Sequence, residues 1–267
     1  MKNQTAIIFN IGRELLEGLT LDRNANFMAG RLSSLGFRVR SIQVLDDVEE
    51  EMVAAFKQAL AVQPNFVFTT GGMGPGLDDI TRQAVAKAAG LPLVLDPKAE
   101  EMLKTGYRRL HAKGVVEDAA LNDERRRMAM LPKGSTCFEN PIGTAPAVRL
   151  EVGATTFFLL PGTSEEMQRL FTDVAMPVLE KAAAGQHRKT RIVDYPHRDE
   201  SALGRLLQEV MKRFPGVTAK SQSSGNEMNL KIKIVLTGED ANERMLEELL
   251  GRAEADLRAR LGLEKRG

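Results

Sequence analysis

The sequence predicts an α/β fold with a mostly parallel sheet, followed by a smaller α+β domain. Three observations support this prediction. Strand-like and helix-like segments alternate up to residue 185, as expected of a parallel sheet with helices on both faces. The first such segment, AIIFNIG (6–12), is continuously apolar, which is typical of a strand covered on both sides. Beyond residue 185 the chain becomes polar and charged, so we expect domains at 1–185 and 190–267.

Hydrophobic periodicity assigns the elements of the first domain. The helix after the first strand has Asp22 or Asn24 as its cap and ends at Gly36. A Thr or Ser followed by Glu166 gives the last helix of this domain a capping signature. The expected helices are 22–35, 48–61, 80–89, 96–114, a short basic helix or turn within 122–132, and 163–184. The expected strands are 6–12, 38–45, 66–70 and a hairpin over 148–160.

The second domain shows a different order of elements. We interpret QHRKTRIVDYPHRDE (186–200) as a linker whose only strand is 191–194, and SQSSGNE (221–227) as a flexible turn. The remaining expected elements are a helix over 200–213, strands over 217–221 and 229–236, and a helix over 242–261.

Composition excludes several functional classes. The chain has 267 residues and a net charge of +1, so no overall field attracts nucleic acid or an anionic membrane. Its single cysteine, Cys137, excludes an intrachain disulfide and suits a reducing cytosol. No apolar run approaches the roughly 20 residues of a membrane-spanning helix. We therefore expect a cytoplasmic protein without nucleic-acid or membrane partners.

The stretch TTGGMGPGLDDIT (69–81) is the most informative motif. Its glycines Gly71, Gly72 and Gly74 directly follow a predicted strand, where ligands bind in open parallel sheets. Without Cβ atoms, such a loop lets backbone amides approach a phosphate, and the next helix adds partial positive charge. Asp78 and Asp79 would repel that phosphate unless a cation intervenes, so we infer a hard divalent ion such as Mg²⁺.

Simpler interpretations stay open for the acidic residues. Asp78 or Asp79 could serve only as a helix N-cap after a tight turn. Asp46 and Asp47 follow the second strand, where they could join Asp79 around a metal or cap the next helix.

Two further small-residue loops repeat the pattern. NPIGTAPA (140–147) could offer an amide of Gly143 and the hydroxyl of Thr144 to a phosphate, and LLPGTSEEM (159–167) places Gly162 at another helix start. The run Arg125–Arg127 is either a solvated face or a phosphate clamp.

Several common motifs are absent. The glycine loop lacks the Lys-Ser/Thr of a Walker motif and the GxGxxG of nicotinamide sites, and the chain has no GxSxG. Cys137 has no recognisable catalytic partner, so we expect a buried thiol rather than a nucleophile.

Taken together, TTGGMGPGLDDIT, NPIGTAP and LPGTSEEM resemble the molybdopterin-binding domain superfamily, and more narrowly the amino-terminal domain of the competence/damage-inducible CinA family. The likeness begins at NIGRELLEGLTLDRN (10–24) and covers nearly the whole chain. It implies a three-layer α/β/α domain that binds a phosphorylated ligand, either an adenine nucleotide or a pterin such as molybdopterin. The functional acids of the family fall on Asp79 and Asp46, which we expect to be catalytic and to bind the metal. Ligand-binding positions fall on Gly71, Gly72, Gly74, Asp78, Glu14, Asn24, Asn140, Gly143, Thr144 and Gly162.

CinA-like proteins are associated with metal-dependent cleavage of nucleotide pyrophosphates such as ADP-ribose or FAD. This resemblance implies a stand-alone form without the deamidase domain of the longer members, and a homo-oligomer. The chain departs from the family pattern at Arg13 and Arg23, where Asp and Thr are usual, and at Gly76 and 163–164. Those arginines favour an anionic ligand while removing a metal ligand. Three hypotheses follow: a metal-dependent pyrophosphatase, a non-catalytic molybdopterin or nucleotide binder, and a protein-interaction module that works through the small domain.

Overall fold

The structure is a computed structural model that describes residues 4–183, 187–196, 199–224 and 231–263. It divides into unit 1, Met1–Ser33 with Phe37–Ala182, and unit 2, Ser34–Gly36 with Ala183–Gly267. Within the described ranges, no helix combines the length and the apolar character that crossing a bilayer requires.

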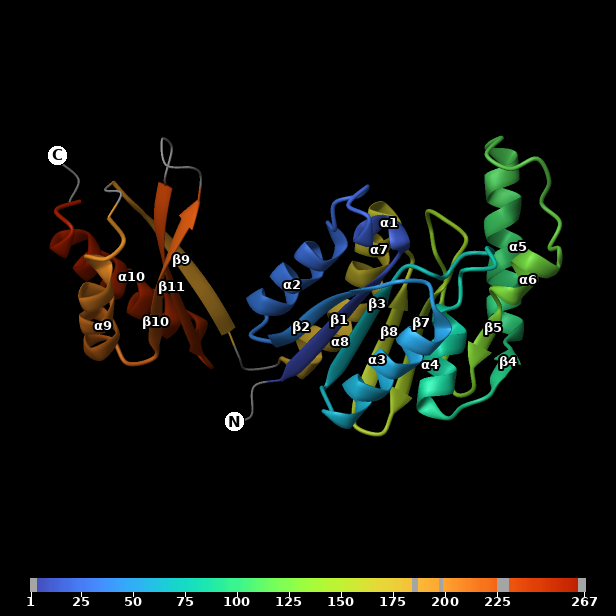
Figure 1. Ribbon diagram of the computed structural model, residues 1–267, viewed down its shortest axis with the longest axis horizontal. Helices are drawn as coiled ribbons and strands as arrows, with labels where there is room; N and C mark the ends of the chain where they lie inside the picture. The colour runs from blue at the N-terminus through green and yellow to red at the C-terminus, as the bar shows by residue number, and fades with distance from the viewer. Residues whose placement is uncertain (1–3, 184–186, 197–198, 225–230, 264–267) are drawn as a thin grey trace. The chain divides into compact units, whose positions relative to one another are not determined.

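A mostly parallel sheet forms the centre of unit 1 (Figure 1). In the described part of this unit the sheet has six strands in the order β2-β1-β3-β8-β7-β6, of which β2, β1, β3 and β8 are parallel. Because β1 lies between β2 and β3, the order reverses there, which creates a topological switch point. The strands are β1 (Thr5–Ile11), β2 (Arg38–Leu45), β3 (Phe66–Thr70), β6 (Thr136–Phe138), β7 (Ala147–Val152) and β8 (Thr155–Leu160).

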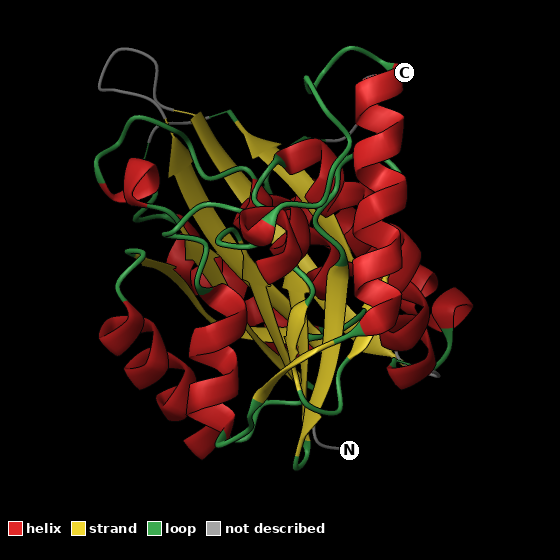
Figure 2. Ribbon diagram, turned by 90° about the vertical axis from the view of Figure 1, so that its right-hand side faces the viewer, coloured by secondary structure: helices red, strands yellow, loops and turns green. Residues whose placement is uncertain are grey.

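Helices lie on both faces of this sheet (Figure 2), so the predicted α/β class is confirmed. The side chains of α3 and α4 pack with those of β1, β3 and β8 in one core cluster. On the other face, Phe68 and Phe158 stack at 5.4 Å between ring centroids, and Phe171 packs against Phe68. The helices are α1 (Arg13–Leu16), α2 (Asn24–Ser34), α3 (Glu49–Ala61), α4 (Thr81–Ala89), α5 (Pro97–Ala112), α6 (Asp123–Arg127), α7 (Ser164–Leu170) and α8 (Met176–Ala182), the last two joined by the π-helical turn η1 (Phe171–Ala175).

Three short strands were missing from the sequence prediction. Strand β4 (Leu93–Leu95) pairs with β5 (Met130–Pro132) in a separate two-stranded ribbon, and β6 adds an edge to the main sheet. Each has only three residues, which is too short to show a period of two. The predicted hairpin is present as β7 and β8.

Unit 2 is an antiparallel sheet, with strand order β10-β11-β9 in its described part. Two helices contribute one side of its core, which their leucines share with Val193, Ile232, Ile234 and Leu236. The elements are β9 (His187–Tyr195), α9 (Leu203–Arg213), β10 (Val217–Ser224), β11 (Lys231–Asp240) and α10 (Glu243–Arg260).

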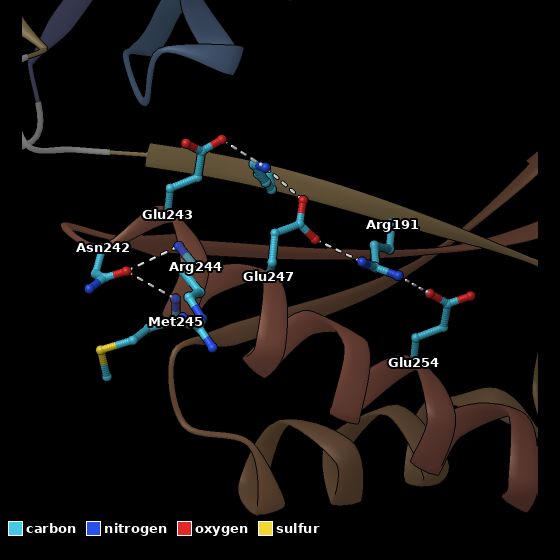
Figure 3. A network of polar contacts seen from close by, with 8 residues as sticks. Arg191, Asn242, Glu243, Arg244, Met245, Glu247 and Glu254 are labelled. Carbon is cyan, nitrogen blue, oxygen red and sulfur yellow. Dashed lines mark hydrogen bonds and ion pairs between the residues drawn. The ribbon is translucent and has the colours of Figure 1, made fainter.

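The predicted linker was wrong in part, because β9 begins at His187 rather than at residue 191. Lys189 and Arg191 face helix α10, where Glu247 binds both and Glu254 binds Arg191 at 2.9 Å (Figure 3). These charged inward positions conceal the apolar alternation that identifies a strand. Similarly, 221–224 of the predicted turn belong to β10, while 225–227 and the predicted strand start at 229–230 lie outside the described residues.

Candidate functional site

A cavity of about 530 Å³ lies at the sheet edge where parallel strands end. Strands β1, β3 and β8 end at Ile11, Thr70 and Leu160, and residues at or just beyond these ends line the cavity. Its size suits a nucleotide-sized ligand. Open parallel sheets bind ligands beyond the carboxyl ends of their strands, so the cavity occupies the position that the topology favours.

The glycine loop after β3 takes a path that side chains would block. Gly71 and Gly72 have φ values of 99° and 62°, in the left-handed region that glycine adopts at little cost. A Cβ on Gly71 would collide with the carbonyl oxygen of Ile11, and a Cβ on Gly162 would lie 3.2 Å from the Cα of Gly71. The glycines therefore allow the loops after β3 and β8 to meet at the cavity.

The carbonyl groups of Gly71, Gly72 and Met73 turn toward helix α4. The hydroxyl of Thr81 donates to Gly71 O at 2.8 Å, the amide of Thr81 donates to Gly72 O at 3.1 Å, and Arg82 binds Met73 O. In a trans peptide, the N–H of the next residue points opposite to the carbonyl. The N–H groups of Gly72, Met73 and Gly74 thus point away from α4, and no acceptor in the described part of the chain receives them. All three residues line the cavity, so this loop can bind an anion.

Arg82 binds backbone carbonyl groups of this loop. Its side chain is 4% exposed, and its Nη2 donates to Gly74 O at 3.2 Å and to Asp79 O at 3.4 Å in addition to the Nη1 bond to Met73 O. Burial lowers the pKa of Arg82 from its ordinary value to about 10, with Asp79 opposing that shift. Sequence reasoning missed this residue because it looks like an ordinary charge in an amphipathic helix.

Acidic side chains dominate the cavity. Among the described residues that line it, Arg23 is the one cationic side chain, whereas six carry carboxylates: Glu14, Asp22, Asp47, Asp78, Asp79 and Glu166. Burial raises the pKa of Asp47, and the negative charges of Asp78, Glu14 and Asp46 raise it further, while the amide of Arg13 opposes this. A polyanion would meet repulsion here unless a cation accompanies it.

The structure separates the two aspartates that follow β2. Asp46 forms an ion pair with Arg13, at 2.9 Å between Oδ2 and Nη2, and does not line the cavity, whereas Asp47 does. Neither caps α3, whose N-cap residue Val48 makes no side-chain capping bond. Of the two acids predicted to bind a metal, Asp79 lines the cavity and Asp46 does not, whereas Asp47 does.

The capping interpretation also fails for the glycine loop. The N-cap residue of α4 is Ile80, again without a side-chain capping bond. The carboxylate of Asp79 instead accepts the amide of Gly76 at 2.7 Å. A Cβ on Gly74 would lie 2.6 Å from Asp79 Oδ2, so the glycine leaves the room that this carboxylate occupies.

Two other predicted ligand residues, Asn24 and Asn140, form hydrogen bonds within and between the loops. Asn24 lines the cavity, but its amide donates to Thr70 Oγ1 at 3.1 Å and to Gly162 O at 2.7 Å, and its oxygen accepts Ser164 Oγ at 2.8 Å. Asn140 is buried and accepts the amide of Gly143 at 2.8 Å. Neither Asn140 nor Gly143 lines the cavity.

The remaining predicted positions either line the cavity or lie outside it. Those that line the cavity are Gly71, Gly72, Gly74, Asp78, Asp79, Glu14, Thr144 and Gly162. The arginine cluster lies outside it: Arg125 covers the ring of Tyr107 at 4.1 Å, and Arg126 pairs with Glu100 at 3.1 Å. Cys137 is buried, as predicted, and burial raises the pKa of its thiol, with Asp96 raising it further.

Sequence reasoning overlooked Asn10 as a cavity residue and treated Asp22 and Glu166 only as helix-start signals. All three line the cavity. Asn10 had a detectable signal, since it is the one polar residue in an otherwise apolar strand run.

The donor set does not form a ready-made metal centre. Within the described ranges, no group of three or more His, Cys, Asp or Glu side chains gathers at a spacing that could hold a metal ion. Mg²⁺, however, commonly uses one or two carboxylates together with waters and the phosphates of its ligand. Asp47, Asp78 and Asp79 line the cavity and carry the carboxylate oxygens that such an ion uses.

The chain is similar to known proteins in sequence and in fold. A protein of Pyrobaculum calidifontis is 37% identical over 84% of this chain and 83% of its own, and one of Thermococcus kodakarensis is 35% identical over 89% and 92%. The solved structure of the protein CinA from Thermoplasma acidophilum is similar with a TM-score of 0.59 and 33% identity, covering 66% of this chain and 99% of that one. The family described as a probable molybdopterin binding domain matches residues 7–181. The chain belongs to this family.

Proposed function

We propose that unit 1 binds a small phosphorylated ligand, an adenine nucleotide or a pterin, through the glycine loop. The observation that carries this proposal is the set of three consecutive N–H groups, of Gly72, Met73 and Gly74, that turn away from α4 beside the cavity. Their carbonyls are already engaged, so the amides need no rearrangement to bind a phosphate. Preorganised donors of this type favour negative charge.

The ligand enters with a divalent cation. Six carboxylates and one guanidinium line the described cavity, so a bare pyrophosphate would be repelled. Asp47 and Asp79 are the acids we assign to the cation, with Asp78 nearby. A bound Mg²⁺ would polarise phosphoryl oxygens and lower the pKa of a water molecule.

From this arrangement we infer metal-dependent hydrolysis of a nucleotide pyrophosphate of the ADP-ribose or FAD type. The loop amides would hold one phosphate in place while Asp47 and Asp79 keep the cation beside the bond that breaks. Positioning and charge neutralisation are the main contributions that proteins make to phosphoryl chemistry.

A second candidate, binding without catalysis, has an observation in its favour. Arg13 forms an ion pair with Asp46, and the described residues contain no cluster of three or more acidic, His or Cys side chains that could hold a metal. In that case the cavity would retain a molybdopterin or nucleotide without cleaving it.

Titration calorimetry with ADP-ribose, FAD and molybdopterin, with Mg²⁺ and with EDTA, tests binding. Separation of products after incubation tests cleavage. Binding with cleavage supports the hydrolase, and binding without cleavage supports the second candidate. If none of these ligands binds in the presence of Mg²⁺, both are refuted.

Asp79→Asn tests the assigned acid, because the amide oxygen can still accept the N–H of Gly76. We expect cleavage to fall by roughly 100-fold, the scale of losing one electrostatic contributor to a transition state, with affinity changed little. Glu165→Gln is the matched control, since Glu165 is exposed and does not line the cavity. Unchanged cleavage by Asp79→Asn would remove Asp79 from the mechanism.

A further inference from the structure

Asn10 is a buried polar residue whose position brings it into the cavity. It lies near the carboxyl end of β1, is 1% exposed, and lines the cavity together with Asp22. Its register partner on β3 is Thr70. The residue therefore lies at the strand edge where the ligand is expected.

The orientation of the Asn10 amide is determined by its neighbour. Its Nδ2 donates to Asp22 Oδ2, and an ionised carboxylate can only accept hydrogen bonds. The NH₂ group must therefore face Asp22, which is itself held by the amide of Ala25 at 2.9 Å. This arrangement directs Oδ1 elsewhere, and no donor among the described residues reaches it.

Among the described residues that line the cavity, Asn10 is the one with a buried side-chain polar atom that has no hydrogen-bond partner, and Asn24 provides a comparison. Both residues line the same cavity, but the amide group of Asn24 makes three hydrogen bonds, including the one that its oxygen accepts from Ser164. Buried polar atoms are normally hydrogen-bonded. The oxygen of Asn10 is thus an acceptor for which the cavity, rather than the fold, would supply the donor.

We propose that Asn10 determines specificity by accepting a hydrogen bond from a neutral N–H or O–H group of the ligand. The donor is an amino group of the heterocycle or a ribose hydroxyl, because the adjacent carboxylate of Asp22 also accepts and would repel a ligand acceptor. This inference rests on the proposed binding of a phosphorylated ligand. It adds a residue that selects among such ligands.

Calorimetric titrations with paired ligands in Mg²⁺ buffer test the assignment. GDP and IDP differ in one amino group, as do ADP and purine riboside diphosphate, while ADP and its 2′-deoxy and 3′-deoxy forms differ in one hydroxyl. For wild type we expect that in one pair the ligand without the donor group binds about tenfold more weakly than the ligand that has it. The pair that shows this loss identifies the donor as amino or hydroxyl.

In Asn10→Leu the difference within that pair should disappear, whereas a merely structural role would weaken both members equally. Thr69→Val is the matched control, because Thr69 also has a buried, unpartnered oxygen in the described chain but does not line the cavity. It should leave the difference unchanged. Asn10→Thr provides a second variant that keeps a donor for Asp22, should the leucine variant not fold.

Two outcomes overturn the assignment: no wild-type difference in any pair, or a difference that survives in the folded Asn10 variant. Failure of wild type to bind any of the diphosphates in Mg²⁺ is a separate result. That result would also overturn the assignment, whereas the proposed function is refuted only if ADP-ribose, FAD and molybdopterin all fail to bind.

Discussion

Removal of the Arg82 guanidinium tests whether this side chain holds the glycine loop. Burial lowers its pKa from the ordinary value to about 10, so keeping the charge inside the protein costs about 3 kcal/mol, at about 1.4 kcal/mol per pH unit. Three bonds to backbone carbonyls oppose this cost, each contributing about 1.5–3 kcal/mol because the donor is charged. The bonds exceed the cost, and we expect Arg82→Met to lower the unfolding free energy by about 2–4 kcal/mol.

Chemical denaturation monitored by circular dichroism measures this change. Arg127→Met is the matched control, because Arg127 is exposed and donates to a single carbonyl of the same loop, Pro75 O at 3.1 Å. It should stay within about 0.5 kcal/mol of wild type. A variant of Arg82 as stable as this control would show that the loop holds its shape without the guanidinium.

Two further predictions concern the loop and its acids. Gly74→Ala should weaken binding of a phosphorylated ligand by about tenfold or more, since the new Cβ would lie 2.6 Å from Asp79 Oδ2, and calorimetry measures this change. As a control, Gly30→Ala places its Cβ in open space on α2. It should stabilise the folded protein by about 0.5–1 kcal/mol, which melting curves would show. Asp47→Asn should raise Tm in EDTA, and the gain should grow from pH 4 to pH 7. The folded-state pKa of Asp47 is raised, so its stabilising contribution is present below the unfolded value and is lost as pH rises through the folded value. A pH-independent difference in Tm would contradict that role.

The sequence predicts the long elements of the fold well, because their periodicity is strong. The helix over 96–114 appears as α5, with Asp96 capping the amides of Lys98 and Ala99 at 2.9 Å. The short strands and the start of β9 escape prediction for physical reasons. A three-residue strand has almost no pattern, and in β9 Lys189 and Arg191 face inward because glutamates of α10 neutralise them.

The sequence predicts which loops form the candidate site, but it does not predict how their side chains are arranged. The motif order identifies the glycine loop and its acids, but not which side chains face the cavity. Asn24 and Asn140 have the residue type of ligand contacts, yet the amide of Asn24 bonds to residues at or just beyond the ends of β3 and β8, and that of Asn140 bonds within its own loop. This bonding depends on pairings between residues more than a hundred positions apart for Asn24, which no local pattern reveals.

Arg13 and Arg23, the two arginines that depart from the family pattern, lie in different places that the sequence alone does not distinguish. From the sequence alone, both favour an anionic ligand and remove a metal ligand. In the structure, the guanidinium of Arg13 forms an ion pair with Asp46, and neither residue lines the cavity, whereas Asp47 does. Arg23 lines the cavity itself, where it can meet the anion directly. If so, Arg13→Asp would add negative charge outside the cavity, whereas Arg23→Thr would remove the only cationic side chain among its described lining residues. Only the second change should weaken binding of a phosphorylated ligand when Mg²⁺ is saturating.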